Sequence, residues 1–449
     1  MKATSTDSSG DLAIRTVALG AIGTTAVMSF GHGVNDLFTG MVPAMLPIFQ
    51  SRFSLEESSL ALLIGTFAFS SSFLGPFFGG LADRYGARLV AALAIAFTSA
   101  VLSLPGLMSD ATLLLGLLAL AGLGSAALHP AGGAIVRESA GNRTALALGL
   151  FSAGGMLGYA VGPIAVLWLV GGPGLEAGVW LVLPGLLAAF LVYRFAPAPP
   201  PAKAARPLTK GLSLGLLRGP VGVLTAVATL NGLVTLTFTS AFPLWLVDQY
   251  GLAPDDMTLG LALTVFALAS AVGGIGGGVL SLRIRRERLI ALTMTGAVVP
   301  LLLLFALHPG TLEFYAAVAA AGLLTYAGVP LLVHGAQDLA VGRTGAASGM
   351  LFGLASAVAA VIYVGMGWLQ TKLGITPVLV ITYLGLLPAA LLAHRTLSRA
   401  PLSGTSSAGK VAIACGCFEF LVEATSPLKA SPCEQDCGCA ERHGCAVLV

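Results

Sequence analysis

The segment His32-Gly33-Val34-Asn35-Asp36 places an imidazole, an amide and a carboxyl group close together in an apolar stretch of the chain. His32 and Asp36 are four residues apart, so in a helix they share one face, with Asn35 beside them. Because hydrocarbon disfavours a charged carboxylate, an acid buried there usually faces a cavity and can take up a proton near neutral pH. We therefore predict a proton-binding site at Asp36, with His32 and Asn35 as helpers. The alternative is a structural hydrogen bond between Asp36 and a neighbouring helix.

Further histidines lie in similar surroundings. His129 precedes Pro130 in an apolar segment, and its side chain titrates in the useful range. It is a candidate for proton transfer or, alternatively, a satisfied polar group beside a proline kink. His334 and Asp338 are also spaced by four, near the end of another apolar segment. They could bind substrate or stabilise the helix end; together with Asn35 we assign them to a substrate cavity.

The elements that carry these residues have the composition of a membrane protein. The chain is 56% hydrophobic and 10% charged, against roughly 25% charged residues in soluble domains. Its apolar runs are continuous and near or above the roughly 20 residues that a spanning helix needs, which excludes a barrel. We predict an all-α membrane protein with twelve transmembrane helices. The predicted spans are 17–49, 57–80, 88–107, 112–137, 143–169, 174–195, 217–249, 257–281, 288–307, 312–339, 344–370 and 375–396.

The chain also matches itself at an offset of 200 residues. The matched residues are Phe38-Thr39 with Phe238-Thr239, Pro43 with Pro243, Leu123 with Leu323, Pro130 with Pro330, Arg143-Thr144 with Arg343-Thr344, and Gly149 with Gly349. Unless this is chance similarity, two six-helix halves surround a central site with pseudo-symmetry. The predicted parts are an N-terminus (1–16), a first bundle (17–196), a Pro-rich linker (197–216), a second bundle (217–398) and a Cys-rich tail (399–449).

The distribution of positive charge predicts the orientation. Of 23 Lys and Arg residues, only Arg52 and Lys372 fall in loops that follow odd-numbered spans. Positive charge stays in the cytoplasm, so we place both termini there, in a multi-pass protein of the plasma (bacterial inner) membrane. The net charge of +3 then reflects topology, and no nucleic-acid partner is expected. The expected partners are the lipid bilayer and a small-molecule substrate, and we expect a monomer.

Two glycine-bearing motifs suggest how the helices move and pack. The loop after the second span reads Gly79-Gly80-Leu81-Ala82-Asp83-Arg84-Tyr85-Gly86-Ala87-Arg88. Gly79 and Gly80 would let the helix end turn, and Asp83 could accept from a helix N-terminus or an arginine. We predict a cytoplasmic gate that includes Arg84, Gly86 and Arg88; a solvated basic turn is the alternative.

The fifth predicted span carries Gly149, Gly154, Gly158, Gly162 and Pro163. The last three glycines are spaced by four and would form a smooth groove for close helix packing, and the proline can bend the helix. The alternative is ordinary packing between membrane helices, without a special role.

Taken together, these motifs resemble those of a known family. The gate loop is similar to the major facilitator signature Gly-x-Leu-x-Asp-Arg-x-Gly-Arg-Arg/Lys, with Ala87 where arginine is usual. The glycine-rich span is similar to that of drug–proton antiporters, without their closing glycines. With His-x-x-Asn-Asp and His-Pro, residues 25–170 look like the fosmidomycin-resistance branch, and Gly342–Gly349 extends the resemblance. It implies the major facilitator fold and proton-driven export of small drugs. Ala131 stands where that branch often has Glu, so the substrate could differ.

The tail after residue 399 carries every cysteine: Cys415, Cys417, Cys433, Cys437, Cys439 and Cys445. In a reducing cytoplasm these favour a soft metal ion over disulfides. The alternatives are a disordered tail whose cysteines have no role, and a reading frame that continues past the true stop.

We therefore predict a secondary transporter that exports a drug-like or toxic compound by proton antiport and alternating access, with the proton gradient as energy source and no cofactor. The apolar segments contain no nucleophile–base pair, metal cluster or phosphate loop, so an enzyme is not expected. The alternative function is efflux or sensing of a soft metal or metalloid through the tail.

Overall fold

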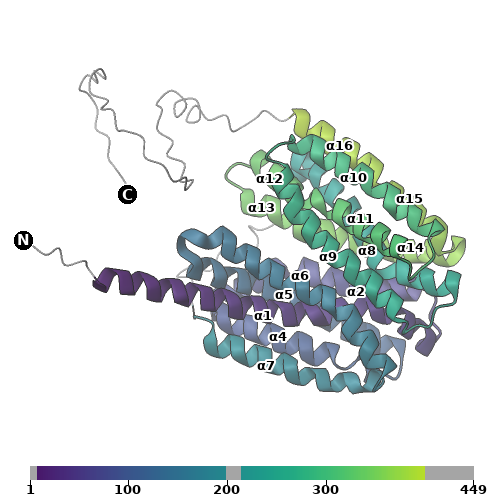
Figure 1. The fold of residues 1–449 in the computed structure, drawn as a ribbon, viewed down its shortest axis with the longest axis horizontal. Helices are drawn as coiled ribbons and strands as arrows, with labels where there is room; N and C mark the ends of the chain where they lie inside the picture. The colour runs from purple at the N-terminus through teal and green to yellow at the C-terminus, as the bar shows by residue number, and fades with distance from the viewer. Residues whose placement is uncertain (1–7, 199–213, 400–449) are drawn as a thin grey trace, which may run out of the picture. The chain divides into compact units, whose positions relative to one another are not determined.

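The computed structural model describes residues 8–198 and 214–399, and within these ranges its regular structure is entirely helical (Figure 1). The first half holds α1 (Ser8–Phe53), α2 (Glu57–Phe73), α3 (Gly75–Tyr85), α4 (Ala87–Leu102), α5 (Ala111–Ala140), α6 (Thr144–Gly171) and α7 (Val182–Phe195). The second half holds α8 (Pro220–Tyr250), α9 (Met257–Leu280), α10 (Arg286–Leu303), α11 (Leu312–Ala327), α12 (Val329–Leu339), α13 (Thr344–Gly349), α14 (Ala355–Leu373), α15 (Ile375–Leu384) and α16 (Leu386–Arg399). The predicted all-helical membrane class is confirmed.

The number of membrane spans agrees less closely with the prediction. Among the described residues, ten helical segments are long and apolar enough to cross a membrane, and α2 with α3, bent by 45°, adds an eleventh. Helix α1 is not among them, although it has 46 residues. Its middle carries three polar residues, His32, Asn35 and Asp36. The predicted count of twelve is reached only if α1 is counted as a span.

Several predicted spans consist of two helices rather than one. The breaks between α2 and α3 and between α11 and α12 come directly before Pro76 and Pro330, each in the first turn of the following helix. Proline has no N–H to donate to the preceding turn, so a new helix begins there. The span that ends in α14 contains a π-helical turn, Met350–Leu354. Such turns are frequent at functional sites.

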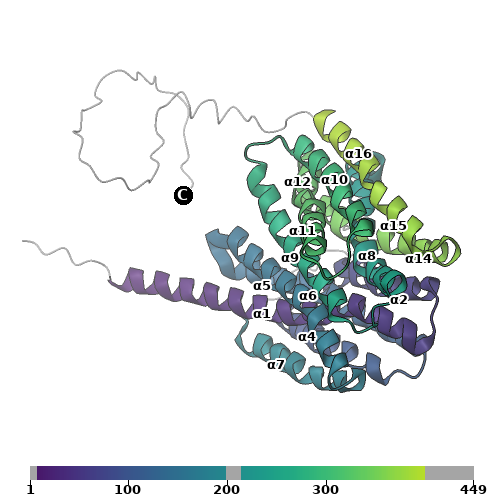
Figure 2. The same ribbon diagram turned by 45° about the vertical axis from the view of Figure 1, so that its right-hand side comes forward.

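The two halves touch mainly through two pairs of helices. Helix α2 packs along α14, and α6 packs along α9 (Figure 2). The Oγ1 atom of Thr264 in α9 donates to the carbonyl of Ala160 in α6, with 2.5 Å between the two oxygens. At the start of α2, the amide of Ser58 donates to Thr371 Oγ1 of α14 at 3.2 Å, and that hydroxyl donates to Glu57 Oε2 at 3.3 Å. The α2–α14 contact therefore includes polar links between the halves.

Within the first half, α1 and α6 approach each other through glycine. A Cβ atom on Gly154 would meet the backbone of Ser29, and one on Gly158 would meet the backbone of Gly33. A Cβ on Gly162 would meet the backbone of α1 at Leu37 and Gly40. These three glycines of α6 therefore let the two backbones lie in contact. Close approach of this kind is how helices gain packing energy in a membrane.

The other two residues of the predicted packing motif lie differently. Gly149 is exposed, and the space where its Cβ would stand is open. Pro163 is buried inside α6, which continues without a break to Gly171.

We predict that Gly158→Ala lowers the melting temperature of the purified protein in detergent by several degrees. The added methyl group overlaps the α1 backbone, and overpacking of this kind costs about 1–3 kcal/mol. The matched control is Gly149→Ala on the same helix, which has open space and should gain up to about 1 kcal/mol from helix propensity. Equal melting temperatures for the two variants would contradict the close α1–α6 packing.

Candidate functional site

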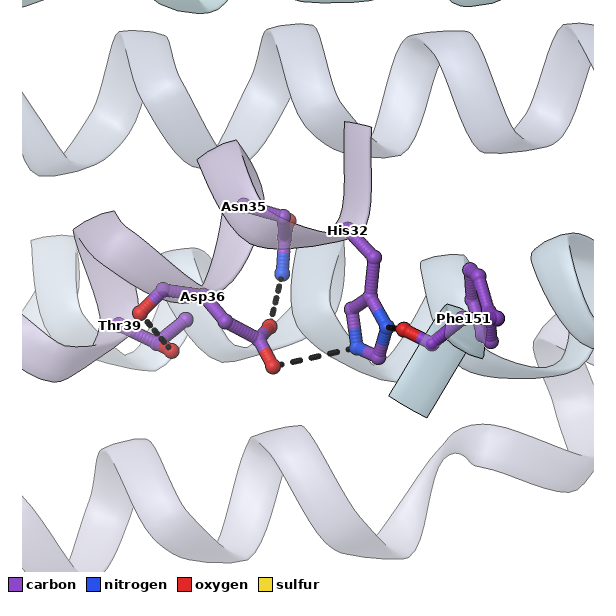
Figure 3. Close-up of polar contacts among 5 residues, drawn as sticks. All are labelled: His32, Asn35, Asp36, Thr39 and Phe151. Carbon is purple, nitrogen blue, oxygen red and sulfur yellow. Dashed lines mark hydrogen bonds and ion pairs between the residues drawn. The ribbon is translucent and has the colours of Figure 1, made fainter. Parts of the chain in front are cut away.

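The most polar part of α1 lies against α6, and Figure 3 shows its contacts. His32 Nδ1 lies 2.8 Å from the carbonyl oxygen of Phe151 in α6. His32 Nε2 lies 3.1 Å from Asp36 Oδ2, as the spacing of four predicted. Asn35 Nδ2 donates to the other carboxylate oxygen, Asp36 Oδ1, at 2.9 Å. Each oxygen of this partly buried carboxyl group thus has a polar neighbour.

These distances restrict where protons can be. A carbonyl oxygen can only accept, so His32 Nδ1 must be the donor toward Phe151. In neutral histidine the other nitrogen, Nε2, then carries a lone pair, and it faces Asp36 Oδ2. Two acceptors at this distance repel unless a proton lies between them. The pair is therefore complete only when His32 is an imidazolium or Asp36 is protonated.

His129 completes the group of predicted proton-binding residues. Its ring meets the His32 ring edge-on, with 4.9 Å between the centroids, while the Phe151 ring stacks on His32 at 4.2 Å. His32 is buried, Asp36 is partly buried and His129 is exposed. The structure thus brings together three residues that lie on two helices, α1 and α5.

The same residue types can ligate a metal ion, and this is the one such group of three that the described residues contain. Their ligand atoms lie within 4.8 Å of one another. Metal binding needs both histidines and the carboxyl group free of the bound proton. The direct contact between His32 and Asp36 fits a shared proton instead. We refer to His32, Asp36 and His129, the three residues predicted to bind protons, as the proton cluster.

Glycine also shapes this cluster. A Cβ on Gly155 of α6 would stand 2.5 Å from the His32 ring and 2.7 Å from Asp36 Oδ2. Any side chain at this position would push the ring or the carboxyl group aside. The sequence pattern drew attention to the neighbouring glycines at 154 and 158, and it missed the role of this one.

A cavity of about 280 Å³ lies between the two halves. Its walls come from α2, α6, α8, α11, α12, α14 and the π-helical turn. Seven of the lining residues are polar, and the others are apolar. The polar lining residues are Ser72, Tyr159, Asn231, Thr235, Thr239, Tyr326 and Ser356. The volume is close to the lower end of the range of about 300–1,000 Å³ that ligand pockets occupy.

One residue connects the cavity to the proton cluster. Tyr159 lines the cavity and lies one helical turn beyond Gly155, which touches the cluster. The Tyr159 side chain lies beside Thr239 of α8, and both residues line the cavity. Tyr159 therefore lies where α6 of one half meets α8 of the other.

The residues that sequence reasoning placed in a substrate cavity lie elsewhere. Asn35 is fully buried and bonds to Asp36, and neither it nor His334 nor Asp338 lines the cavity. The Asp338 carboxylate pairs with Arg286 of α10, and His334 Nδ1 lies 3.3 Å from Asp338 Oδ2. This pair links the end of α12 to the start of α10, while the His334 side chain is largely exposed.

The cavity residues that were missed left a readable signal in the sequence. Asn231, Thr235 and Thr239 are spaced by four in α8, so they form a polar stripe on one face of an apolar helix. The same spacing argument identified His32 and Asp36. Tyr159 and Tyr326 gave no comparable signal, because a single tyrosine in an apolar span has no periodic partner.

The predicted gate loop is only partly as expected. Gly79 and Gly80 lie inside α3, so the expectation that the helix turns there is wrong. The chain turns at Gly86, whose φ of 95° favours glycine. Among the described residues, Asp83 makes no ion pair, and Arg84 is exposed with its guanidinium over the Tyr85 ring. Arg88 lies over the Tyr193 ring and reaches the carbonyl of Ala196 at 3.5 Å, which ties α4 to the end of α7.

The predicted metal ligands of the tail, from Cys415 to Cys445, lie outside the residues that the structure describes, as does most of the Pro-rich linker.

Comparison with known proteins identifies the family. The family model of the Major Facilitator Superfamily matches residues 28–350. The chain is 28% identical over 363 residues to the fosmidomycin resistance protein of Escherichia coli (strain K12), which covers 77% of this chain and 86% of that protein. It is 27% identical over 380 residues to the uncharacterized MFS-type transporter YfnC of Bacillus subtilis (strain 168), with 79% and 88% covered.

Solved structures of the same fold are more distant in sequence. A bacterial homolog of the human lysosomal transporter Spinster, in an inward-facing and occupied conformation, matches with a TM-score of 0.66 at 18% identity, over 84% of this chain and 97% of that one. The nucleoside transporter NupG matches with a TM-score of 0.66 at 11% identity, over 84% and 100%. These likenesses support the fold alone. The family model, which spans most of the chain, shows that this integral, multi-pass membrane protein belongs to the major facilitator superfamily of transporters.

Proposed function

We propose that this transporter exports a small drug-like or toxic compound in exchange for protons. The observation that carries the proposal is the 3.1 Å contact between His32 Nε2 and Asp36 Oδ2, which a proton on either residue would stabilise. A site inside the membrane that can gain and lose a proton is what an antiporter needs. The name of the Escherichia coli relative, a fosmidomycin resistance protein, is consistent with export of a toxic compound.

The proton cluster is placed to influence the contact between α1 and α6. His32 and Asp36 both belong to α1, and His32 is anchored to α6 through the Phe151 carbonyl. Loss of the proton leaves two lone pairs facing each other within α1, and the resulting repulsion turns the His32 ring and weakens its bond to α6. Tyr159 of α6 lies beside Thr239 of α8, so a shift of α6 reaches the cavity wall. Proton release and rearrangement of the cavity walls are thereby coupled.

Alternating access follows from where the halves touch. The polar links of Ser58, Glu57 and Thr371 join the start of α2 to the end of α14. The asymmetry of Lys and Arg between the loops places this end outside the cytoplasm. The observed state is then closed to the outside, and the halves must separate there to release substrate. Both termini lie in the cytoplasm of a plasma (bacterial inner) membrane, and the protein acts as a monomer driven by the proton gradient without a cofactor.

We predict that Asp36→Asn abolishes gradient-driven efflux while the protein still inserts into the membrane. A growth screen of an expressing strain against drugs, with fosmidomycin among them, identifies a compound, and its efflux is then followed in proteoliposomes with an imposed pH gradient. The amide cannot release a proton, so transport should fall to the level of empty vesicles. Asp248→Asn, the same change at an exposed position of α8, should leave efflux intact. Retained pH-dependent transport in Asp36→Asn would reject the assignment.

We predict that Thr371→Val shifts the protein toward the state that is open at the Glu57 end. The variant loses the hydrogen bonds to Ser58 and Glu57, a change of about 1 kcal/mol or about fivefold in the equilibrium. Spin labels on Glu56→Cys and Leu373→Cys, in a chain without the tail cysteines, report the distance across this contact by double electron–electron resonance. The longer distances should gain population. Thr382→Val, a buried threonine bonded to its own helix, is the control, and an unchanged distribution in Thr371→Val would contradict the role of the contact.

A second candidate function rests on the six cysteines between Cys415 and Cys445. Clustered thiolates bind soft metal ions, so the tail could sense or help to export such an ion or a metalloid. We predict that deletion of residues 411–449 leaves drug efflux unchanged if the tail has no part in transport. Loss of metal tolerance in growth assays, with drug efflux intact, would favour the second function.

A further inference from the structure

The cavity between the halves is polar without being charged. None of the described residues that line it is a Lys, Arg, His, Asp or Glu. A charged molecule would leave water for a site that offers no counter-charge, and the cost of burying an unpaired charge is large. An uncharged molecule meets no such cost. The uncharged lining of the cavity therefore favours uncharged substrates over charged ones.

The polar groups of the cavity also favour one kind of hydrogen-bonding partner. Thr235 Oγ1 donates to the carbonyl of Asn231 at 3.1 Å, and Thr239 Oγ1 donates to that of Thr235 at 3.1 Å. Both hydroxyl groups therefore donate their hydrogen bond within their own helix, and their oxygens can still accept a hydrogen bond from a ligand. These two hydroxyl groups offer acceptors to a molecule in the cavity and no donor to an anion.

Asn231 supplies the group that a ligand would satisfy. It lines the cavity, only 4% of its surface is exposed, and its Oδ1 atom has no hydrogen-bond partner within the described structure. An unpaired buried amide oxygen costs about as much as a lost hydrogen bond, so it normally has a partner. Rotation of the side-chain amide exchanges Oδ1 and Nδ2, so the group can present an acceptor toward the cavity.

We propose that the central cavity binds an uncharged amphipathic molecule with a hydroxyl or amide donor, and that Asn231 is the residue that selects for this donor. The inference rests on the proposed transport function and adds its substrate class. The apolar part of the ligand lies against Leu236, Leu351 and Phe352, and its donor meets the amide of Asn231 and the oxygen of Thr235. Anions and permanent cations are excluded by the absence of a paired charge.

The test is a binding measurement on the full-length protein in detergent, with no proton gradient. The probes are naphthylethanol, naphthylethylamine and naphthylacetate, which share one apolar ring system and differ only in a neutral, cationic or anionic end at pH 7. Saturation-transfer difference NMR gives the affinity of each. A variant with the cavity filled, Ala228→Trp, measures binding to micelles and to other surfaces, which is subtracted.

We expect saturable binding of naphthylethanol, and we expect the affinity for each charged probe to be lower by about tenfold or more. Asn231→Leu should lower the affinity for naphthylethanol by about three- to tenfold. It should not lower the melting temperature of the ligand-free protein, because it removes an unpaired buried oxygen; a structural role for Asn231 would lower it. Thr225→Val, on the same helix but outside the cavity lining, is the matched control and should bind normally.

Three outcomes would overturn the proposal. A charged probe could bind as tightly as naphthylethanol, or the binding of naphthylethanol could be the same in Ala228→Trp as in the unaltered protein. The third outcome is that Asn231→Leu binds naphthylethanol with unchanged affinity. Each leaves the proton-antiport function standing, since that is decided by efflux in Asp36→Asn. Conversely, the expected binding together with unimpaired efflux in Asp36→Asn would reject proton coupling and keep the substrate class.

Discussion

The carboxyl group of Asp36 sits in a helix that the rest of the protein surrounds with apolar side chains, and its charge has to be balanced there. One oxygen accepts from Asn35, and the other lies 3.1 Å from His32 Nε2, where a proton is needed. The tautomer of His32 is fixed by the Phe151 carbonyl of another helix. The protonation state of this pair therefore depends on the relative position of α1 and α6.

The close packing of these two helices is what makes the arrangement possible. At Gly154, Gly158 and Gly162 the backbone of α6 touches that of α1, and Gly155 leaves room for the imidazole and the carboxyl group between them. A larger residue at any of these positions would separate the helices by more than a hydrogen bond can span. The glycines thus hold the distance on which the chemistry of the cluster depends. Tyr159, on the next turn of α6, extends the same contact to α8.

Much of this could be read from the sequence, and the exceptions have physical causes. The spacing of His32 and Asp36 predicts their contact, because both lie on one helix. The meeting of His129 with them depends on how α1 and α5 pack, which spacing does not encode. The cavity was missed because seven separate elements build it, although the stripe Asn231, Thr235 and Thr239 was visible. The error at Gly79 and Gly80 arose because a glycine pair was taken as a turn, whereas the positive φ is at Gly86.

The match at an offset of 200 residues pairs the helix of the predicted proton site with a helix of the cavity. Asn231, Thr235 and Thr239 of α8 occupy the positions that correspond to Gly31, Asn35 and Thr39 of α1. The position of Asp36 corresponds to Leu236, which lines the cavity as an apolar residue. The same helix face thus carries an acid–imidazole pair in one half and an uncharged polar stripe in the other. An unpaired carboxylate at position 236 would place a charge in the cavity, whereas Leu236 leaves the second half free to bind a neutral molecule, as proposed above. The proposed proton site is then confined to the first half, and Tyr159 lies between the two sites.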